Sequence, residues 1–172
     1  MSSAEEHLKN FLEAVGLSGD PELERTPQLV AELLRTFASP IEGHEVFTLP
    51  TPGSDPVVLR DLSFYSICAH HLLPFFGSAT IAYVPAGRIA GLGSLVRALE
   101  HFATRPQLQE RLGSQLADHL LDQLSASVVV VRLEARQMCM EMRGTHSQAT
   151  VVTQAIRGRG NSDRLEALIR NG

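Results

Sequence analysis

Residues 63–74 contain three side chains that bind transition metals well. Cys68, His70 and His71 fall within four consecutive positions, and Cys68 and His71 form a Cys-x-x-His pair. This spacing lets a turn or a strand end bring both side chains onto one ion, and zinc accepts thiolate and imidazole ligands readily. We therefore interpret the stretch as half of a metal site, which the fold must complete from elsewhere in the chain.

The only other cysteine of the chain, Cys139, is the candidate for the third ligand. It follows an apolar run, Ser127 to Leu133, that is typical of a buried strand. Two cysteines and one histidine are one ligand short of a closed tetrahedral zinc site, and an open position filled by water is typical of catalytic zinc. Two simpler interpretations stay open, because buried cysteines often serve as small apolar side chains and a His-His pair can lie in an ordinary loop.

Size and composition are those of an ordinary globular protein. The chain has 172 residues, of which 44% are hydrophobic and 20% charged. A net charge of −4 is no general signature of nucleic-acid binding, so an anionic ligand would need a local group of basic residues. No apolar run reaches membrane-spanning length, and the acidic N-terminus is unlike a signal peptide. We expect a cytoplasmic protein that binds neither nucleic acid nor membrane, with its cysteines reduced.

Hydrophobic periodicity predicts a helical N-terminal part. Ser3 and Glu6 form a capping box before a helix over residues 4–16, and a second helix is predicted over residues 27–38. Residues 39–56 are rich in proline and glycine, which predicts an irregular surface connection.

The rest of the chain alternates between strand and helix patterns. The predicted elements are strands over 57–65 and 77–84, helices over 93–102 and 107–124, strands over 126–136 and 148–156, and a short helix capped by residues 161–163. We divide the chain into a helical extension with its connecting loop, residues 1–56, and a second domain, residues 57–172.

Several motifs, in the same order along the chain, resemble those of the GTP cyclohydrolase I family. Residues 68–75, Cys-Ala-His-His-Leu-Leu-Pro-Phe, resemble the family's Cys-Glu-His-His segment, and residues 138–144, Met-Cys-Met-Glu-Met-Arg-Gly, resemble a second one. Further matches are the helix that begins at Thr26-Pro27 and the segments 81–85, 91–92 and 109–112. Because the matches run over most of the chain, together they are more specific than any one of them.

The resemblance implies the tunnelling fold, an α+β architecture. Residues 57–172 would form its catalytic domain, a four-stranded antiparallel sheet with two helices on one face, and residues 1–56 its N-terminal helical extension. In the family, sheets join through their edges into a homodecamer with active sites at subunit interfaces. The resemblance therefore also implies a homo-oligomer.

The resemblance assigns a metal and a reaction. Cys68, His71 and Cys139 would hold Zn²⁺, and His70 would act as a proton shuttle. The implied enzyme is a zinc hydrolase that attacks C8 of the imidazole ring of GTP and yields formate and 7,8-dihydroneopterin triphosphate. That reaction belongs to pterin and folate biosynthesis.

Six residues at the family's substrate-binding positions are candidates for that role here: Leu92, Ser94, Arg97, Gln109, Glu110 and Arg143. Gln109 and Glu110 would recognise the guanine edge, whose adjacent N–H groups suit a carboxylate. The guanidinium groups of Arg97 and Arg143 would bind the triphosphate, because their forked donors match phosphate oxygens.

Several positions depart from the family pattern. Gln137 stands where the family has a second catalytic histidine, and glutamine cannot carry a proton near neutral pH. Gly93-Ser94 replaces Ser-Lys, so a phosphate-binding lysine is absent, and Ala69 replaces the glutamate of Cys-Glu-His-His. His146, in the loop after Gly144, is a candidate substitute for the missing histidine.

These departures leave three hypotheses. The leading one is a complete GTP cyclohydrolase. The second is a diverged paralogue that hydrolyses another guanine-like purine or stops at the ring-opened formamide, because the first C–N cleavage needs fewer proton transfers than ring closure. The third is a zinc-containing binding protein without turnover.

Overall fold

The structure, a computed structural model, describes residues 3–38, 44–160 and 162–170. The chain forms two compact units, Met1–Pro40 and Ile41–Gly172. The domains expected from the sequence, residues 1–56 and 57–172, stay a prediction. Residues 39–43 of the predicted connection and Asn161 of the predicted final cap lie outside the described residues.

The first unit is a pair of amphipathic helices. α1 (Ala4–Ala14) begins after Ser3, whose Oγ accepts a hydrogen bond from the Glu6 N–H at 3.1 Å, as the capping box predicts. The helix ends before the predicted residue 16, where Gly16 takes a left-handed φ of 81°. A short 3-10 turn, η1 (Pro21–Leu23), leads to α2 (Thr26–Ala38), which confirms the second predicted helix.

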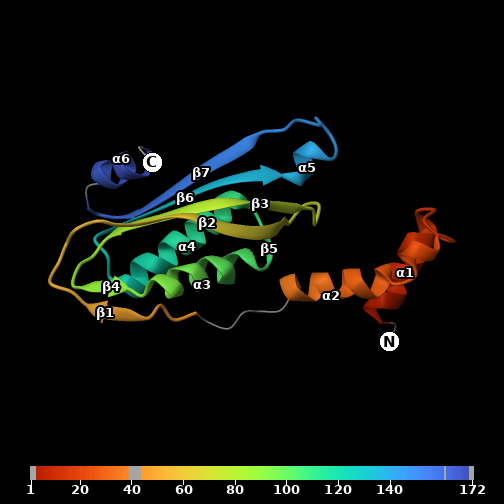
Figure 1. Cartoon of the computed structure of the whole chain (residues 1–172), viewed down its shortest axis with the longest axis horizontal. Helices are drawn as coiled ribbons and strands as arrows, with labels where there is room; N and C mark the ends of the chain where they lie inside the picture. The colour runs from red at the N-terminus through yellow and green to blue at the C-terminus, as the bar shows by residue number, and fades with distance from the viewer. Residues whose placement is uncertain (1–2, 39–43, 161, 171–172) are drawn as a thin grey trace. The chain divides into compact units, whose positions relative to one another are not determined.

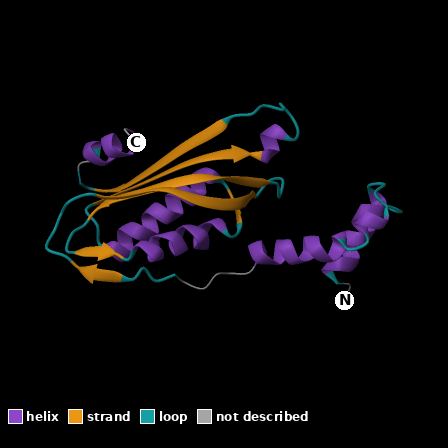
Figure 2. Cartoon of the chain, viewed as in Figure 1, coloured by secondary structure: helices purple, strands orange, loops and turns teal. Residues whose placement is uncertain are grey.

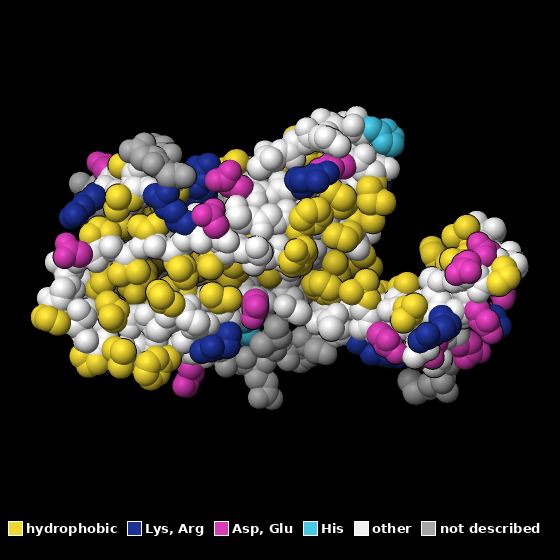
Figure 3. All heavy atoms as spheres, viewed as in Figure 1, with side chains coloured by type: hydrophobic (Ala, Val, Ile, Leu, Met, Phe, Trp, Pro, Cys, Tyr) yellow, Lys and Arg dark blue, Asp and Glu magenta, His cyan; other side chains and the backbone are white. Residues whose placement is uncertain are grey.

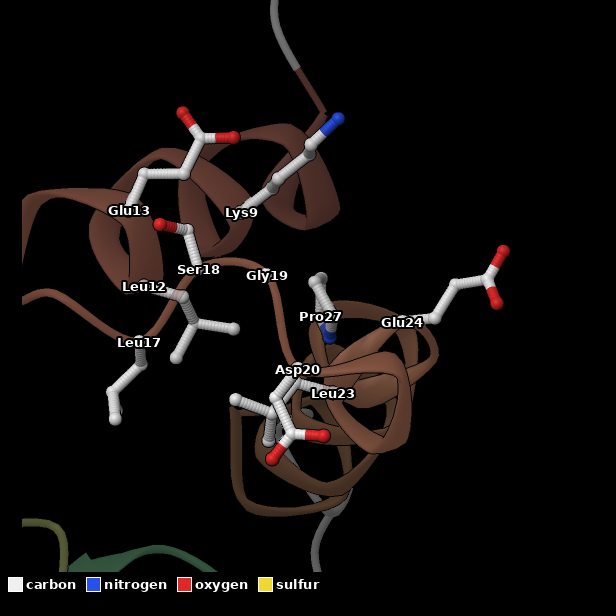
Figure 4. A pocket seen from close by; sticks show the side chains of 10 residues that line it. All are labelled: Lys9, Leu12, Glu13, Leu17, Ser18, Gly19, Asp20, Leu23, Glu24 and Pro27. Carbon is white, nitrogen blue, oxygen red and sulfur yellow. The ribbon is translucent and has the colours of Figure 1, made fainter.

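A cavity of about 240 Å³ lies in this first unit, between α1 and the turn that precedes α2 (Figure 4). Leu12, Leu17 and Leu23 line it, and the Glu24 carboxylate is directed away from it (Figure 4). None of its lining residues is predicted to bind metal or substrate. The candidate site is therefore to be sought in the second unit.

The second unit is built on one mixed sheet in the strand order β5-β2-β3-β6-β7 (Figures 1 and 2). Its four long strands are antiparallel neighbours: β2 (Val57–Cys68), β3 (Pro74–Val84), β6 (Val128–Gln137) and β7 (Thr150–Gly158). The predicted interruption at Arg60-Asp61 is a register shift in β2, where Asp61 takes a φ of 56°. This sheet confirms the α+β class and the four antiparallel strands of the tunnelling fold.

Three short strands were not predicted. β5 (Pro106–Gln107) pairs parallel to the end of β2, so the helix predicted from residue 107 begins only at Gln109. β1 (Thr48–Pro50) pairs with β4 (Arg88–Ala90), so part of the predicted irregular connection is a strand. Segments of two or three residues show no periodicity, and each of these depends on a partner far away in the sequence.

Two helices, α3 (Leu92–Ala103) and α4 (Gln109–Leu124), cover one face of the sheet (Figures 1 and 2). Most of their leucines repeat every three or four residues and are fully buried against inward-facing residues of the strands. This core contains Leu95, Leu99, Leu112, Leu116 and Leu120 from the helices and Ile81, Val129, Val131 and Leu133 from the strands. The predicted pair of helices on one face is confirmed.

The opposite face of the sheet is only partly covered. The short helix α6 (Asp163–Arg170) packs Leu165 and Ile169 against β3 and β6 at one end. Elsewhere apolar side chains stay accessible, and Figure 3 shows hydrophobic atoms spread over the strands. Tyr65, Val152 and Ile156 are among the exposed apolar residues. Within the described parts of the chain, we find no helix long and apolar enough to span a membrane.

Gly77 of β3 offers a test of the sheet register that positions the candidate site. A Cβ added there would overlap the Glu134 carbonyl oxygen and come within 2.7 Å of the Ala135 Cα, and both are backbone atoms of β6. We expect Gly77→Ala to lower the free energy of unfolding by about 3 kcal/mol, the upper part of the range for overpacking. Gly53→Ala is the control, because its Cβ would meet only Thr51 Oγ1 at 3.4 Å. Urea unfolding at one protein concentration measures the free energy of unfolding of both variants. Equal values for Gly77→Ala and Gly53→Ala would contradict the register.

Candidate metal centre and active site

The metal-binding stretch lies where β2 ends. Cys68 is the last residue of β2, and a tight turn follows in which the Leu72 N–H donates to the Cys68 carbonyl at 2.8 Å. Leu72 takes a φ of 54°, and the Cys68 N–H donates to the Leu73 carbonyl at 2.8 Å. This turn brings the His71 ring back beside Cys68.

Cys139 reaches the same end of the sheet from β6. It lies in the one-turn helix α5 (Met138–Glu141) directly after Gln137, the last residue of β6. The sheet register places Ile67 opposite Pro74 and Phe75 opposite Gln137, so the ends of β2 and β6 flank the start of β3. Two cysteines far apart in sequence are therefore neighbours.

The ligand atoms of Cys68, His71 and Cys139 all lie within 4.8 Å of one another. The Cys68 Sγ to His71 Nδ1 distance is 3.9 Å. Tetrahedral zinc with ordinary bond lengths places a sulfur and a nitrogen ligand about 3.6 Å apart. The three residues therefore form a group that could hold a metal ion after small side-chain shifts, and their soft donors suit zinc.

The environment of the Cys139 thiol favours its protonated form in the absence of a cation. Burial raises the pKa of the Cys139 thiol, and the adjacent Cys68 sulfur raises it further, whereas Arg143 acts in the opposite direction. A bound metal would reverse this preference, because a cation stabilises the thiolates that ligate it.

A cavity of about 300 Å³ adjoins two of the three candidate ligands, Cys68 and Cys139. Its lining residues are Cys68, His70, Phe75, Gln107, Leu108, Gln109, Glu110, Gln137, Cys139, Met140 and Val151. The cavity thus brings together His70, the residue at the second catalytic position (Gln137), two metal-ligand candidates and the predicted pair for guanine recognition. It is large enough for part of a nucleotide.

Gln109 is held inside the protein by its own amide. It is 3% exposed, and its Nε2 donates to the carbonyls of Leu133 at 3.1 Å and Val151 at 2.9 Å and to the Thr153 hydroxyl at 3.2 Å. Its Oε1 accepts a hydrogen bond from Gln137 Nε2 at 2.7 Å. The amide therefore ties α4 to β6 and β7, and its predicted contact with guanine stays a prediction. Glu110, the next residue, is exposed beside the cavity.

Comparison with known proteins decides the family. The GTP cyclohydrolase I family model matches residues 4–168. The GTP cyclohydrolase 1 of Streptococcus sanguinis (strain SK36) is 43% identical over 154 residues, which cover 86% of this chain and 84% of that protein. The GTP cyclohydrolase 1 of Hyperthermus butylicus is 39% identical over 163 residues, with coverages of 93% and 83%. The chain belongs to the GTP cyclohydrolase I family.

Membership confirms the resemblance seen in the sequence motifs and makes this chain a member of an enzyme family. The GTP cyclohydrolase 1 of Streptococcus pyogenes serotype M1 is 42% identical over 170 residues, with coverages of 95% and 88%. Among solved structures, an archaeosine synthase QueF-Like protein in its apo form overlaps 61% of this chain and 95% of its own, with a TM-score of 0.49 and 16% identity. That overlap bears on neither substrate nor chemistry.

Three of the substrate-binding positions inferred from the GTP cyclohydrolase I family lie in the first turns of α3, and none of them lines the cavity. Leu92 is exposed, whereas Ser94 is 2% exposed. The Ser94 hydroxyl accepts hydrogen bonds from the Phe47 N–H at 3.1 Å and from Arg97 Nη2 at 3.2 Å. Ser94 therefore joins α3 to the segment before β1, a contact that the sequence did not indicate.

Arg143 and His146 follow α5 and are both exposed. Neither belongs to the cavity lining. Arg143 is close enough to influence Cys139, as the pKa of that thiol shows. The structure therefore leaves their predicted roles, in phosphate binding and in proton transfer, as predictions.

Gln107 is a site residue that the sequence reasoning missed. It is fully buried, pairs with Cys68 in the β5–β2 ladder, and its carbonyl accepts the Ala69 N–H at 2.9 Å. Its Nε2 donates to the Phe102 carbonyl at 3.1 Å and to Gln115 Oε1 at 2.8 Å. A polar residue next to an apolar helical pattern looks like a solvated helix start, so no local signal indicates that it supports the metal-binding turn.

Proposed function

We propose that this chain is a zinc-dependent GTP cyclohydrolase that opens the imidazole ring of GTP at C8 and yields formate and 7,8-dihydroneopterin triphosphate. The main support is the convergence of Cys68, His71 and Cys139 beside a cavity that also contains His70 and Glu110. The product would enter pterin or folate biosynthesis. The cytoplasmic location expected from the sequence stays a prediction.

The donor set fits zinc with one coordination position open. Bound there, zinc would supply the Lewis acidity that makes water nucleophilic near neutral pH. Burial of Cys68 and the hydrogen-bonded turn that follows it would keep two of the ligands in place.

The roles of the protein's own groups follow from their positions. His70 lines the cavity next to His71, with ring centroids 6.2 Å apart, and would move protons to and from the ring nitrogen released at C8. The Glu110 carboxylate would accept hydrogen bonds from the guanine N–H groups. Arg97 and Arg143 would bind phosphate oxygens, with no lysine in the Gly91–Ser94 segment to assist them.

A homo-oligomer is part of the proposal, and the family resemblance implies a decamer. Exposed apolar side chains on the sheet, including Tyr65, Val152 and Ile156, are surfaces that a second copy would cover. Phosphate-binding residues that do not line the cavity would contact GTP if sites form between subunits. Light scattering of the purified protein would give the subunit number, and a monomer would contradict this part.

The second candidate is a paralogue that stops at the ring-opened formamide or uses another guanine-like purine. It is favoured by Gln137, whose Nε2 is engaged by Gln109 at 2.7 Å and which cannot replace a histidine in proton transfer. Zinc-loaded protein incubated separately with GTP, GMP, guanosine and guanine, followed by mass and fluorescence, separates the candidates. A fluorescent pterin with formate supports the first, a hydrated ring-opened product supports the second, and binding without turnover supports a non-catalytic zinc protein.

We expect Gln137→His to raise the rate of pterin formation. The added imidazole would restore a proton-transfer group worth about 10² to 10⁴ in rate. Gln137→Met is the matched control, since it keeps the side-chain length but has no N–H or ring nitrogen. Initial rates of pterin fluorescence measure the effect. A histidine variant no faster than the wild-type protein would show that this position does not limit the reaction.

A further inference from the structure

Three histidines from separate segments meet away from the candidate metal centre. We call His44, His101 and His119 the histidine cluster. The ring centroid of His44, which precedes β1, lies 6.2 Å from that of His101 in α3 and 6.3 Å from that of His119 in α4. The ring centroid of Phe102 lies 4.8 Å from that of His101 and 5.3 Å from that of His119. None of these residues lines the cavity beside Cys68.

The segment around His44 holds the start of α3. His44 Nε2 lies 3.0 Å from the Ser94 carbonyl, to which its N–H can donate. The Phe47 N–H donates to Ser94 Oγ at 3.1 Å, and the Gly91 N–H donates to the Phe47 carbonyl at 2.8 Å. The N-cap of α3 is Gly91, which offers no side-chain hydrogen bond. Contacts from residues 44–47 therefore tie this segment to the start of α3, although they do not replace a side-chain cap.

The histidine cluster is poorly arranged to accept protons. Among the described residues, His101 Nδ1 and His119 Nε2 are buried without a hydrogen-bond partner. Burial lowers the pKa of both rings. At His101, Arg105 and the other two imidazoles lower the pKa further. At His119, the His44 ring lowers the pKa further, whereas a hydrogen bond with the His44 backbone raises it. The charged groups that face the cluster are Arg105, beyond the end of α3, which adds to the repulsion, and Asp122 of α4, which offsets it at His119.

The sign of the pH effect follows from these shifts. Because the pKa of His101 and of His119 is below the ordinary value of 6.5 in the folded chain, the unfolded chain binds more protons as the pH falls below that value. The stability of the packed arrangement is then complete above that pH and declines below it. The lower stability in acid therefore affects residues 44–47, the segment that contains His44.

We propose that His44 is a positioning residue for the first turn of α3 and that the histidine cluster makes this contact weaker in acid. This turn contains Leu92 and Ser94, and the next turn contains Arg97. All three are predicted substrate-binding residues, so the link to substrate rests on the proposed function. Acidification loosens residues 44–47 and, through Ser94 and Gly91, the turn itself. The expected kinetic signature is a higher KM for GTP with little change in kcat.

Amide hydrogen exchange in the full chain tests the positioning role without depending on activity. The reporters are the Phe47 and Gly91 N–H groups, measured at about pH 7.5 and about pH 5.5 and corrected for intrinsic exchange. In the wild-type protein we expect both to be protected at the higher pH and clearly less so at the lower. His44→Ala removes the donor to Ser94 and should reduce protection at the higher pH roughly three- to tenfold, as expected for one lost hydrogen bond.

Two further variants sharpen this test. His44→Gln keeps a side-chain N–H in reach of the Ser94 carbonyl and should restore protection at the higher pH. His7→Asn, a change at an exposed histidine of the first unit, should behave as the wild-type protein at both pH values. Wild-type protection in His44→Ala at the higher pH would overturn the positioning role.

A separate variant tests the pH dependence. His101→Phe keeps a ring against Phe102 but removes one titrating group, so protection at the lower pH should approach that at the higher pH. An unchanged loss of protection would overturn the role of the histidine cluster. GTP kinetics then separate this inference from the proposed function. Changed protection without any GTP turnover would contradict the function alone, and normal turnover with unchanged protection would contradict the inference alone.

Discussion

Replacing Cys139 with alanine should remove the bound metal and lower the turnover rate by more than about 10²-fold. Even the loss of a residue that only hydrogen-bonds to a metal ligand lowers metal affinity or activity about 10- to 100-fold. Cys139 is one of three residues whose ligand atoms lie within 4.8 Å of one another, and the two that remain are too few to hold zinc tightly. Metal analysis after exhaustive dialysis, together with pterin fluorescence and product mass, measures both effects.

The control for this experiment is Met142→Ala, an exposed position three residues further along the chain. It should keep about one zinc per chain and the wild-type rate, because surface changes away from special features have small effects. If Cys139→Ala bound zinc with the same stoichiometry and turned GTP over normally, the proposed metal centre would be wrong. Loss of zinc with retained turnover would separate the metal from the chemistry.

His70→Gln should lower kcat by about 10² to 10⁴ while leaving zinc bound, since it removes the proposed proton shuttle but no ligand. The side chain lines the cavity, and glutamine keeps hydrogen-bonding capacity without the ability to titrate near neutral pH. Single-turnover rates across a pH series, with zinc content measured on the same samples, are the measurement. A merely structural histidine would leave the shape of the pH profile unchanged.

His146→Gln tests which of the two candidate histidines, His70 or His146, transfers protons. His146 is exposed and does not line the cavity, so we expect its replacement to change kcat far less than that of His70. A loss as large as that of His70→Gln would mean that the loop containing His146 closes over the site. His7→Gln, in the first unit, serves as the comparison for a histidine without a proposed role.

The candidate metal centre was predictable because its signals are chemical and rare. A chain with two cysteines, one of them in Cys68-Ala69-His70-His71, offers few ways to assemble a soft metal site. The strand patterns on either side of these residues placed both cysteines near strand ends. The structure then brings Cys68, His71 and Cys139 together through the β2–β3–β6 register.

The burial and hydrogen bonding of the amide side chains near the site were not predictable. Gln107, Gln109 and Gln137 differ little in local sequence signal, yet the first two are buried and Gln137 donates to Gln109. The acceptors that the Gln109 amide reaches are the carbonyls of Leu133 and Val151, which approach it only once the sheet and α4 have packed. The assignment of Gln109 to guanine rested on motif position alone.

What the sequence determined by itself was the set of elements whose causes are local: the capped helix α1, the leucine stripes of α3 and α4, and the apolar strand that precedes Cys139. Periodicity and capping act between residues a few positions apart, so they can be read along the chain. The tertiary structure alone decided the pairing of β5 with β2, the small β1–β4 sheet and the meeting of His44, His101 and His119. Each of these is stabilised by partners distant in the sequence, and such partners leave no periodic pattern to read.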